Sequence, residues 1–108
     1  MSFLFPDKQQ EEMLANETVE QFEERVRNKR SNVLLRYLSN QLEDEDEGVT
    51  LSVIVANNNR KQVAQKFYSL LVLKKQQAIE LYQDLDQEYG EITVTRGIRY
   101  DEALASCA

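Results

Sequence analysis

The chain contains no histidine and no tryptophan, and its 108 residues include one cysteine, one proline and three glycines. The absence of histidine removes the commonest general base, most catalytic triads and metal centres built from clustered cysteine and histidine. A single cysteine, Cys107, cannot form an internal disulfide, which favours a reducing compartment such as the nucleus or cytoplasm. So few glycines and prolines argue against an all-β fold with many turns.

Motifs for nucleotide chemistry are also missing, because the sequence has neither of the common glycine-rich phosphate-binding patterns. Its apolar runs are far shorter than the roughly 20 residues of a membrane span. The sequence also contains an acidic cluster, formed by Asp84, Asp86, Glu88 and Glu91. Its functional interpretation would be a calcium-binding loop or a catalytic acid pair. The cluster lacks the glycine and the final glutamate of an EF-hand loop, so we interpret it as a solvated turn. We therefore expect no catalytic residue, metal, cofactor or membrane contact.

Charge is unevenly distributed around a net value of −6. Residues 1–47 carry 6 basic and 12 acidic groups, and residues 78–108 carry 2 basic and 7 acidic groups. Between them, residues 48–77 carry 5 basic groups and no acidic group. The overall balance opposes DNA binding, but the local basic segment leaves it possible.

The first half of the chain predicts helix. Thr18 followed by Gln21 fits a capping box, and apolar residues then recur at helical spacing as far as Leu42. One helix running unbroken from Thr18 to Leu42 and two helices that meet near Ser31 both satisfy this pattern. Before Thr18 the pattern is weak, which predicts a loose N-terminal arm.

The second half predicts a short element, a long helix and a hairpin. Residues 49–56 suit one or two strand residues and a short helix, and the three asparagines at 57–59 predict a sharp turn with a helix cap. Residues 60–75 predict a helix, and the alternating runs 78–83 and 91–96 predict two strands. Three helices followed by a two-stranded wing constitute a winged helix, a mainly α fold with a small β-hairpin.

The helix at 60–75 has more apolar surface than one core-facing side requires. Leu70 lies within about 40° of Val63 around the helix, whereas Tyr68 and Val72 lie on the far side, close to Leu71. An amphipathic helix normally has one apolar arc of about 100° or somewhat more. Either the N-terminal helix folds back over the second stripe, or a partner protein covers it.

A DNA-binding winged helix, as in a transcription factor, is the alternative for this segment. Its second long helix would contact base edges and phosphates through long polar and basic side chains. The helix has the required charge but has apolar residues at many outward positions. Its basic residues are Arg60, Lys61, Lys66, Lys74 and Lys75.

The stretch 57–81 closely resembles the C-terminal domain of the cohesin kleisin, and more the mitotic than the meiotic type. Its distinctive core is a Phe-Tyr pair, a Leu-Val-Leu run and a strand that ends in Glu-Leu. The segment Tyr89-Gly90-Glu91-Ile92 is similar to the wing of that family, and Asn28-Lys29-Arg30 is similar to the start of its first winged-helix helix. The resemblance covers about residues 28–97.

This resemblance implies a function in chromosome cohesion. In the family the C-terminal winged helix binds the ATPase head of the first cohesin SMC subunit, and the other end of the kleisin binds the partner SMC protein. The closed ring entraps sister DNAs without sequence-specific binding, and further cohesin subunits bind the rest of the parent chain. We therefore expect a non-enzymatic fragment of a longer, chromosome-associated nuclear protein.

The resemblance also implies a domain division and a binding surface. We expect a partly helical N-terminal arm at 1–27, a winged helix at 28–97 that binds the SMC head, and a flexible tail at 98–108. The wing strand at 91–95 would extend a sheet of the partner by backbone pairing. We expect six residues to bind the partner: Phe67, Tyr68, Leu71, Val72, Ile92 and Val94.

Overall fold

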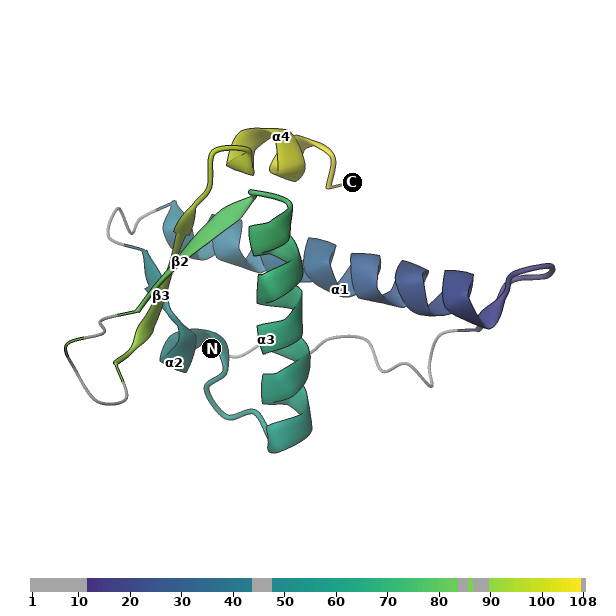
Figure 1. The fold of residues 1–108 in the computed structure, drawn as a ribbon, viewed down its shortest axis with the longest axis horizontal. Coiled ribbons are helices and arrows are strands. Elements are labelled where there is room, and N and C mark those ends of the chain that lie inside the picture. Colours follow the sequence, from purple (N-terminus) through teal and green to yellow (C-terminus); the bar gives the residue numbers. More distant parts are fainter. Residues whose placement is uncertain (1–11, 44–47, 84–85, 87–89, 108) are drawn as a thin grey trace.

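The protein folds as four helices around a small sheet, in a computed structural model that describes residues 12–43, 48–83, 86 and 90–107. The elements are α1 (Val19–Leu42), β1 (Val49–Thr50), α2 (Leu51–Ile54), α3 (Arg60–Lys75), β2 (Ile79–Gln83), β3 (Ile92–Arg96) and α4 (Tyr100–Ala105). Figure 1 shows α3 crossing α1 steeply, with the sheet beside α3 and α4 near the C-terminal end of α3. The predicted mainly α winged-helix arrangement is confirmed.

Helix α1 is unbroken, which decides between the two arrangements left open by the sequence. The predicted capping box is present: Thr18 Oγ1 accepts from the Gln21 N–H at 3.1 Å, and Gln21 Oε1 accepts from the Thr18 N–H at 3.0 Å. Ser31, where the two-helix alternative placed a break, lies within the helix and is buried. Its hydroxyl donates to the Arg27 carbonyl at 3.1 Å, so the polar group is satisfied within the helix itself.

The hairpin belongs to a three-stranded antiparallel sheet in the order β1-β3-β2. The two-residue strand β1 pairs with β3 on the side opposite β2, with Val49 facing Val94. Strand β3 is therefore the central strand, and β2 is the only five-residue edge among the described strands. This order determines which backbone groups remain open to a partner.

Two tight turns orient α3 and the sheet. Asn57 adopts the left-handed backbone with φ 63°, and Asn59 Oδ1 accepts from the Gln62 N–H at 2.9 Å, so the asparagine turn and cap are confirmed. Before β1, Gly48 has φ 97°, and a Cβ there would lie 2.6 Å from the Val94 carbonyl oxygen. Only glycine fits this combination of backbone angle and close approach.

The core lies where α1, α3 and the sheet meet. Tyr100 of α4 also belongs to it. The side chains at its centre are Leu34, Leu35 and Leu38 from α1, Ile54 from α2, Leu70 and Leu73 from α3, and Ile79 and Val94 from the sheet, each at most 1% exposed.

The segment 98–108, predicted as a flexible tail, instead contains α4, and that prediction was wrong. The ring of Tyr100 is buried and lies 5.4 Å below the guanidinium carbon of Arg96. The thiol of Cys107 donates to the Asn32 carbonyl at 3.2 Å, which attaches the end of the segment to α1. Apolar burial and these polar contacts together order the tail.

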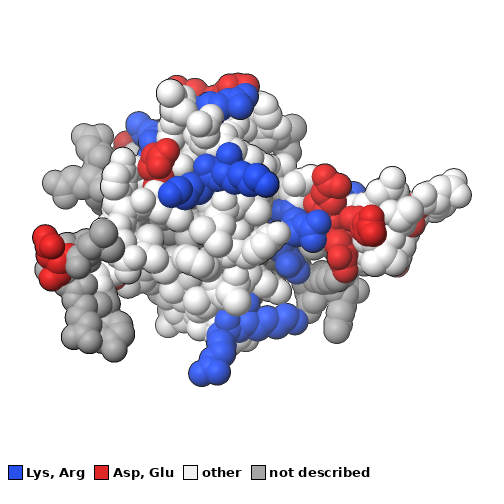
Figure 2. Space-filling model, viewed as in Figure 1, with Lys and Arg blue, Asp and Glu red and all other residues white. Residues whose placement is uncertain are grey.

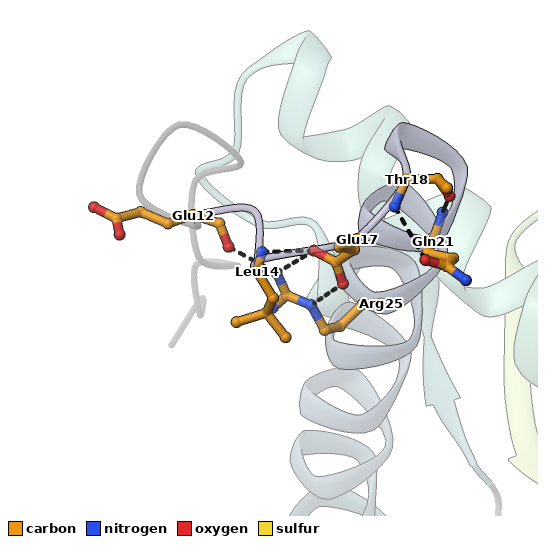
Figure 3. A network of polar contacts seen from close by, with 6 residues as sticks. All are labelled: Glu12, Leu14, Glu17, Thr18, Gln21 and Arg25. Atoms are coloured by element: carbon orange, nitrogen blue, oxygen red, sulfur yellow. Dashed lines mark hydrogen bonds and ion pairs between the residues drawn. The ribbon is translucent and has the colours of Figure 1, made fainter.

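The predicted boundary between an arm at 1–27 and the domain is not a structural break, because α1 continues across it. The described residues before α1 are fixed by Arg25 (Figure 3). Its guanidinium donates to both carboxylate oxygens of Glu17, at 3.0 and 3.2 Å, and to the Glu12 carbonyl at 2.9 Å. The Glu17 carboxylate also accepts from the Leu14 N–H at 3.0 Å, and the bond from Arg25 lowers the pKa of Glu17.

Candidate functional site

Helix α3 has an outward apolar stripe in addition to its core face. Phe67, Tyr68 and Leu71 lie on adjacent turns and remain 36%, 51% and 43% exposed, although α1 packs against the same helix. Helix α1 therefore does not fold over the second stripe. Exposed clusters of large apolar side chains mark interaction sites.

The stripe continues onto the sheet. Phe67 shares a shallow hollow of about 190 Å³ with Leu81, Tyr82 and Ile92. Tyr82, on edge strand β2, is 60% exposed. We call the exposed set Phe67, Tyr68, Leu71 and Tyr82 the α3–β2 surface. Sequence reasoning missed Tyr82, although its alternation with the inward residues of β2 was a usable signal.

Three of the six predicted partner-binding residues are less accessible than expected. Val72 and Ile92 are half-buried, and Ile92 borders the hollow beside Phe67. Val94 is 0% exposed and belongs to the core, so the prediction that it faces a partner was wrong. It occupies the inward position at the middle of the central strand, where neighbouring strands and helices cover it completely.

Backbone pairing through the wing strand is also limited. Thr93 and Val94 of β3 are paired with β1 on one side and with β2 on the other. The expected extension of a partner sheet by residues 91–95 is therefore wrong at the centre of that strand. A partner strand would find its longest free edge along β2.

Lys66, one of the basic residues of the DNA-binding alternative, is a core residue that is 1% exposed. Its ammonium donates to the Ile54 carbonyl at 3.1 Å and to Asn58 Oδ1 at 2.6 Å. Burial lowers the pKa of Lys66 to about 8. This lysine cannot contact a phosphate from its buried position, and the outward face of α3 is apolar where DNA-binding helices are polar.

The acidic wing offers no site in the part that is described. Glu91 accepts from the Ser52 N–H at 3.1 Å and from the Ser52 hydroxyl at 2.5 Å, so its carboxylate holds the wing to the start of α2. Asp84 and Glu88 lie outside the described residues. Within residues 12–43, 48–83, 86 and 90–107, no group of three or more cysteine or acidic side chains is placed to hold a metal ion. None of the helices described is long and apolar enough to cross a membrane.

Comparison with known families gives the same answer as the motif at 57–81. The conserved region of Rad21/Rec8-like proteins matches residues 44–100, more than half of the chain. The chain belongs to the Rad21/Rec8-like family. The resemblance to cohesin kleisins expected from the sequence is therefore confirmed.

Two relatives illustrate the place of this chain within the Rad21/Rec8-like family. Sister chromatid cohesion protein 1 of Caenorhabditis elegans is 40% identical over 75 residues, which are 69% of this chain and 11% of that protein. Double-strand-break repair protein rad21-like protein 1 of Homo sapiens is 39% identical over 79 residues, 69% of this chain and 14% of that protein. The chain thus spans about a tenth to a seventh of the length of these Rad21/Rec8-like relatives.

A solved structure is similar in fold to this Rad21/Rec8-like chain. It is the crystal structure of an SMC head bound to the C-winged helix domain of ScpA. The TM-score is 0.58 with 23% identity, and the match covers 65% of this chain and 97% of the compared one. This likeness supports the winged-helix fold of the family member described here.

Proposed function

We propose that this chain is the C-terminal winged-helix module of a cohesin kleisin and binds the ATPase head of the first cohesin SMC subunit. The α3–β2 surface is the observation that carries the proposal. Three of its side chains lie on one helix face, and each contributes about 1.5–3 kcal/mol when fully removed from water. A partner with a complementary apolar surface would bury them.

The relatives and the fold neighbour support the identity of that partner. One relative is a sister chromatid cohesion protein, and the winged helix of similar fold is bound to an SMC head. Binding of this kind would help to close a cohesin ring around sister DNAs in the nucleus, with DNA entrapped instead of being read by sequence. Other cohesin subunits would bind elsewhere on the parent protein.

The module itself performs no chemistry in this proposal. The described side chains include no histidine, and the acidic groups with known partners have structural roles, as Glu91 and Glu17 do. Docking would instead position the ATPase head. In the docked state we expect Phe67 and Leu71 to be the central contacts, with Tyr68 and Tyr82 around them and Val72 and Ile92 beneath.

The test is capture of a purified SMC head by the 108-residue chain carrying Leu71→Arg. Placing a charge at the centre of an apolar interface should weaken capture by at least about tenfold. Val19→Arg is the matched control, because Val19 is an exposed valine at the distant start of α1. Circular dichroism should report folded protein for both variants, since both side chains are exposed.

Unchanged capture by the folded Leu71→Arg variant would refute the proposal. A variant that unfolds would show that Leu71 supports the fold, and Leu71→Gln then repeats the capture test with a smaller perturbation. Binding of duplex DNA should be weak. Tight binding that falls steeply between about 50 and 200 mM salt would favour the transcription-factor alternative.

A further inference from the structure

A second surface, separate from the hollow on the β2 side, lies where α3 crosses α1. It is a groove of about 430 Å³, within the size range of small-ligand and side-chain pockets. We call it the α1–α3 groove. Side chains of both α1 and α3 line it.

The groove combines an apolar lining with positive charge. Val26, Ala64 and the ring of Tyr68 supply the apolar part. Arg27 and Arg30 approach from α1 and Lys61 from the first turns of α3, against the single carboxylate of Glu23. Figure 2 shows Lys and Arg side chains beside the crossing of the two helices, with Asp and Glu side chains gathered farther along α1 towards its N-terminus.

Arg30 gives a more specific indication. Its Nε is buried and has no hydrogen-bond partner among the described residues. A buried N–H without an acceptor is energetically unfavourable, and more so when the group is charged. The planar guanidinium fork binds a carboxylate through two parallel hydrogen bonds. Because Arg30 lines the groove, a carboxylate placed there would pair with its guanidinium charge and with the neighbouring cations.

We propose that the α1–α3 groove binds an acidic segment of another protein, with its carboxylates on Arg27, Arg30 and Lys61 and an apolar side chain against Tyr68. Duplex DNA fits the groove less well, because a partly apolar groove of about 430 Å³ admits individual side chains and not a duplex. The site is distinct from the proposed contact through Phe67 and Leu71, although Tyr68 borders both. One winged helix would thereby engage an SMC head and a second, acidic partner.

The probe is a short fluorescein-labelled peptide in which glutamate and aspartate flank a central Phe-Leu pair. Its binding to the 108-residue chain is followed by fluorescence anisotropy. The double variant Arg27→Glu with Arg30→Glu should weaken binding at least about tenfold. Lys61→Glu should weaken it as well, and an acidic residue in the first turns of α3 is compatible with the helix dipole, so this variant should remain folded.

The matched control is Lys29→Glu with Arg36→Glu, which reverses two cations of α1 that line a different part of its surface. It should leave peptide binding within about twofold, because its effect is limited to long-range charge. Capture of the SMC head should be unchanged in the Arg27 and Arg30 double variant, since that contact uses other residues.

Four results would overturn the inference. The first is no saturable binding of the acidic peptide, and the second is an equal loss in both double variants, which would reflect net charge alone. The third is loss of SMC-head capture in the Arg27 and Arg30 double variant, which would make the groove part of the head interface. Competition by duplex DNA at the same concentration as the unlabelled peptide would also count against an acidic protein partner.

Discussion

The two faces of α3 are both partly apolar, unlike those of an ordinary amphipathic helix, because Leu70 and Leu73 lie in the core while other large apolar side chains face solvent. The inward face includes Lys66 and Ser69, which are 1% and 2% exposed, whereas the outward face presents Phe67, Tyr68 and Leu71 to solvent. Apolar residues therefore occur on both the buried and the exposed side of this helix. The core is decided by tertiary packing, and the outward face keeps apolar groups that the isolated domain does not need to cover.

Lys66 is accommodated inside because its amine reaches groups that would otherwise lack donors. The Ile54 carbonyl lies at the end of α2, where helical carbonyls have no partner within the helix. Asn58 supplies a second acceptor from the turn before α3. The alkyl part of the lysine packs as an apolar side chain would, and its tip satisfies the turn.

The difference between the inward and outward faces of α3 is tested most strongly by shortening one leucine on each face. Leu70→Ala should lower the free energy of unfolding by about 2–5 kcal/mol, because Leu70 is fully buried and its loss leaves a cavity. Leu71→Ala should cost less than about 1 kcal/mol, because Leu71 is 43% exposed. Urea denaturation followed by circular dichroism measures both. Equal losses would mean that the two faces are not different in energetic terms.

A second test concerns the buried amine. The folded-state pKa of Lys66, about 8, lies below the ordinary value of 10.5, so between these values the unfolded chain binds more protons. Stability should then rise as pH increases through 8. At about 1.4 kcal/mol per pKa unit, we expect a gain of about 1–2 kcal/mol between roughly pH 7.5 and 9.5. Urea denaturation at these two pH values gives the difference.

Lys66→Met is the control for this pH effect. It retains the unbranched side chain and removes the titrating group, so the rise in stability between the two pH values should disappear. Burial raises the pKa of Tyr37, so above about pH 10 the folded chain binds more protons than the unfolded chain and stability falls with rising pH. The measurements therefore stay below about pH 10. An unchanged slope in Lys66→Met would assign the effect to another group.

Much of this fold was predictable because its local signals agree with its tertiary structure. The capping residues Thr18 and Asn59 are where the sequence placed them, and the bounds of α3 match the predicted helix at 60–75. The exposed stripe was predictable as well, because its apolar arc is wider than one core face requires. These features depend on residues close together in the chain.

The errors involve contacts between residues far apart in the sequence. Pairing of β1 with β3 joins residues more than 40 positions apart, and no local pattern indicates it. Helix α4 was missed although Tyr100, Ala103 and Leu104 have helical spacing, because six residues give a weak signal without the α1 surface beside them. Lys66 was counted among the basic residues of the DNA-binding alternative, and its burial was not foreseen because lysine is seldom buried and its acceptors lie outside α3.

The smallest expected change in stability comes from substitutions confined to the outward face of α3. Tyr68→Gln combined with Leu71→Gln replaces about half-exposed apolar groups, so the free energy of unfolding should change by no more than about 0.5 kcal/mol per site. Static light scattering of concentrated protein should at the same time report less self-association, because a contiguous apolar surface favours contact between copies. The informative result is lower self-association with an unchanged free energy of unfolding. Substituting a core residue would lower the free energy of unfolding, and substituting a residue that is merely exposed would change neither quantity. A loss of stability comparable to that of Leu70→Ala would place the stripe in the core.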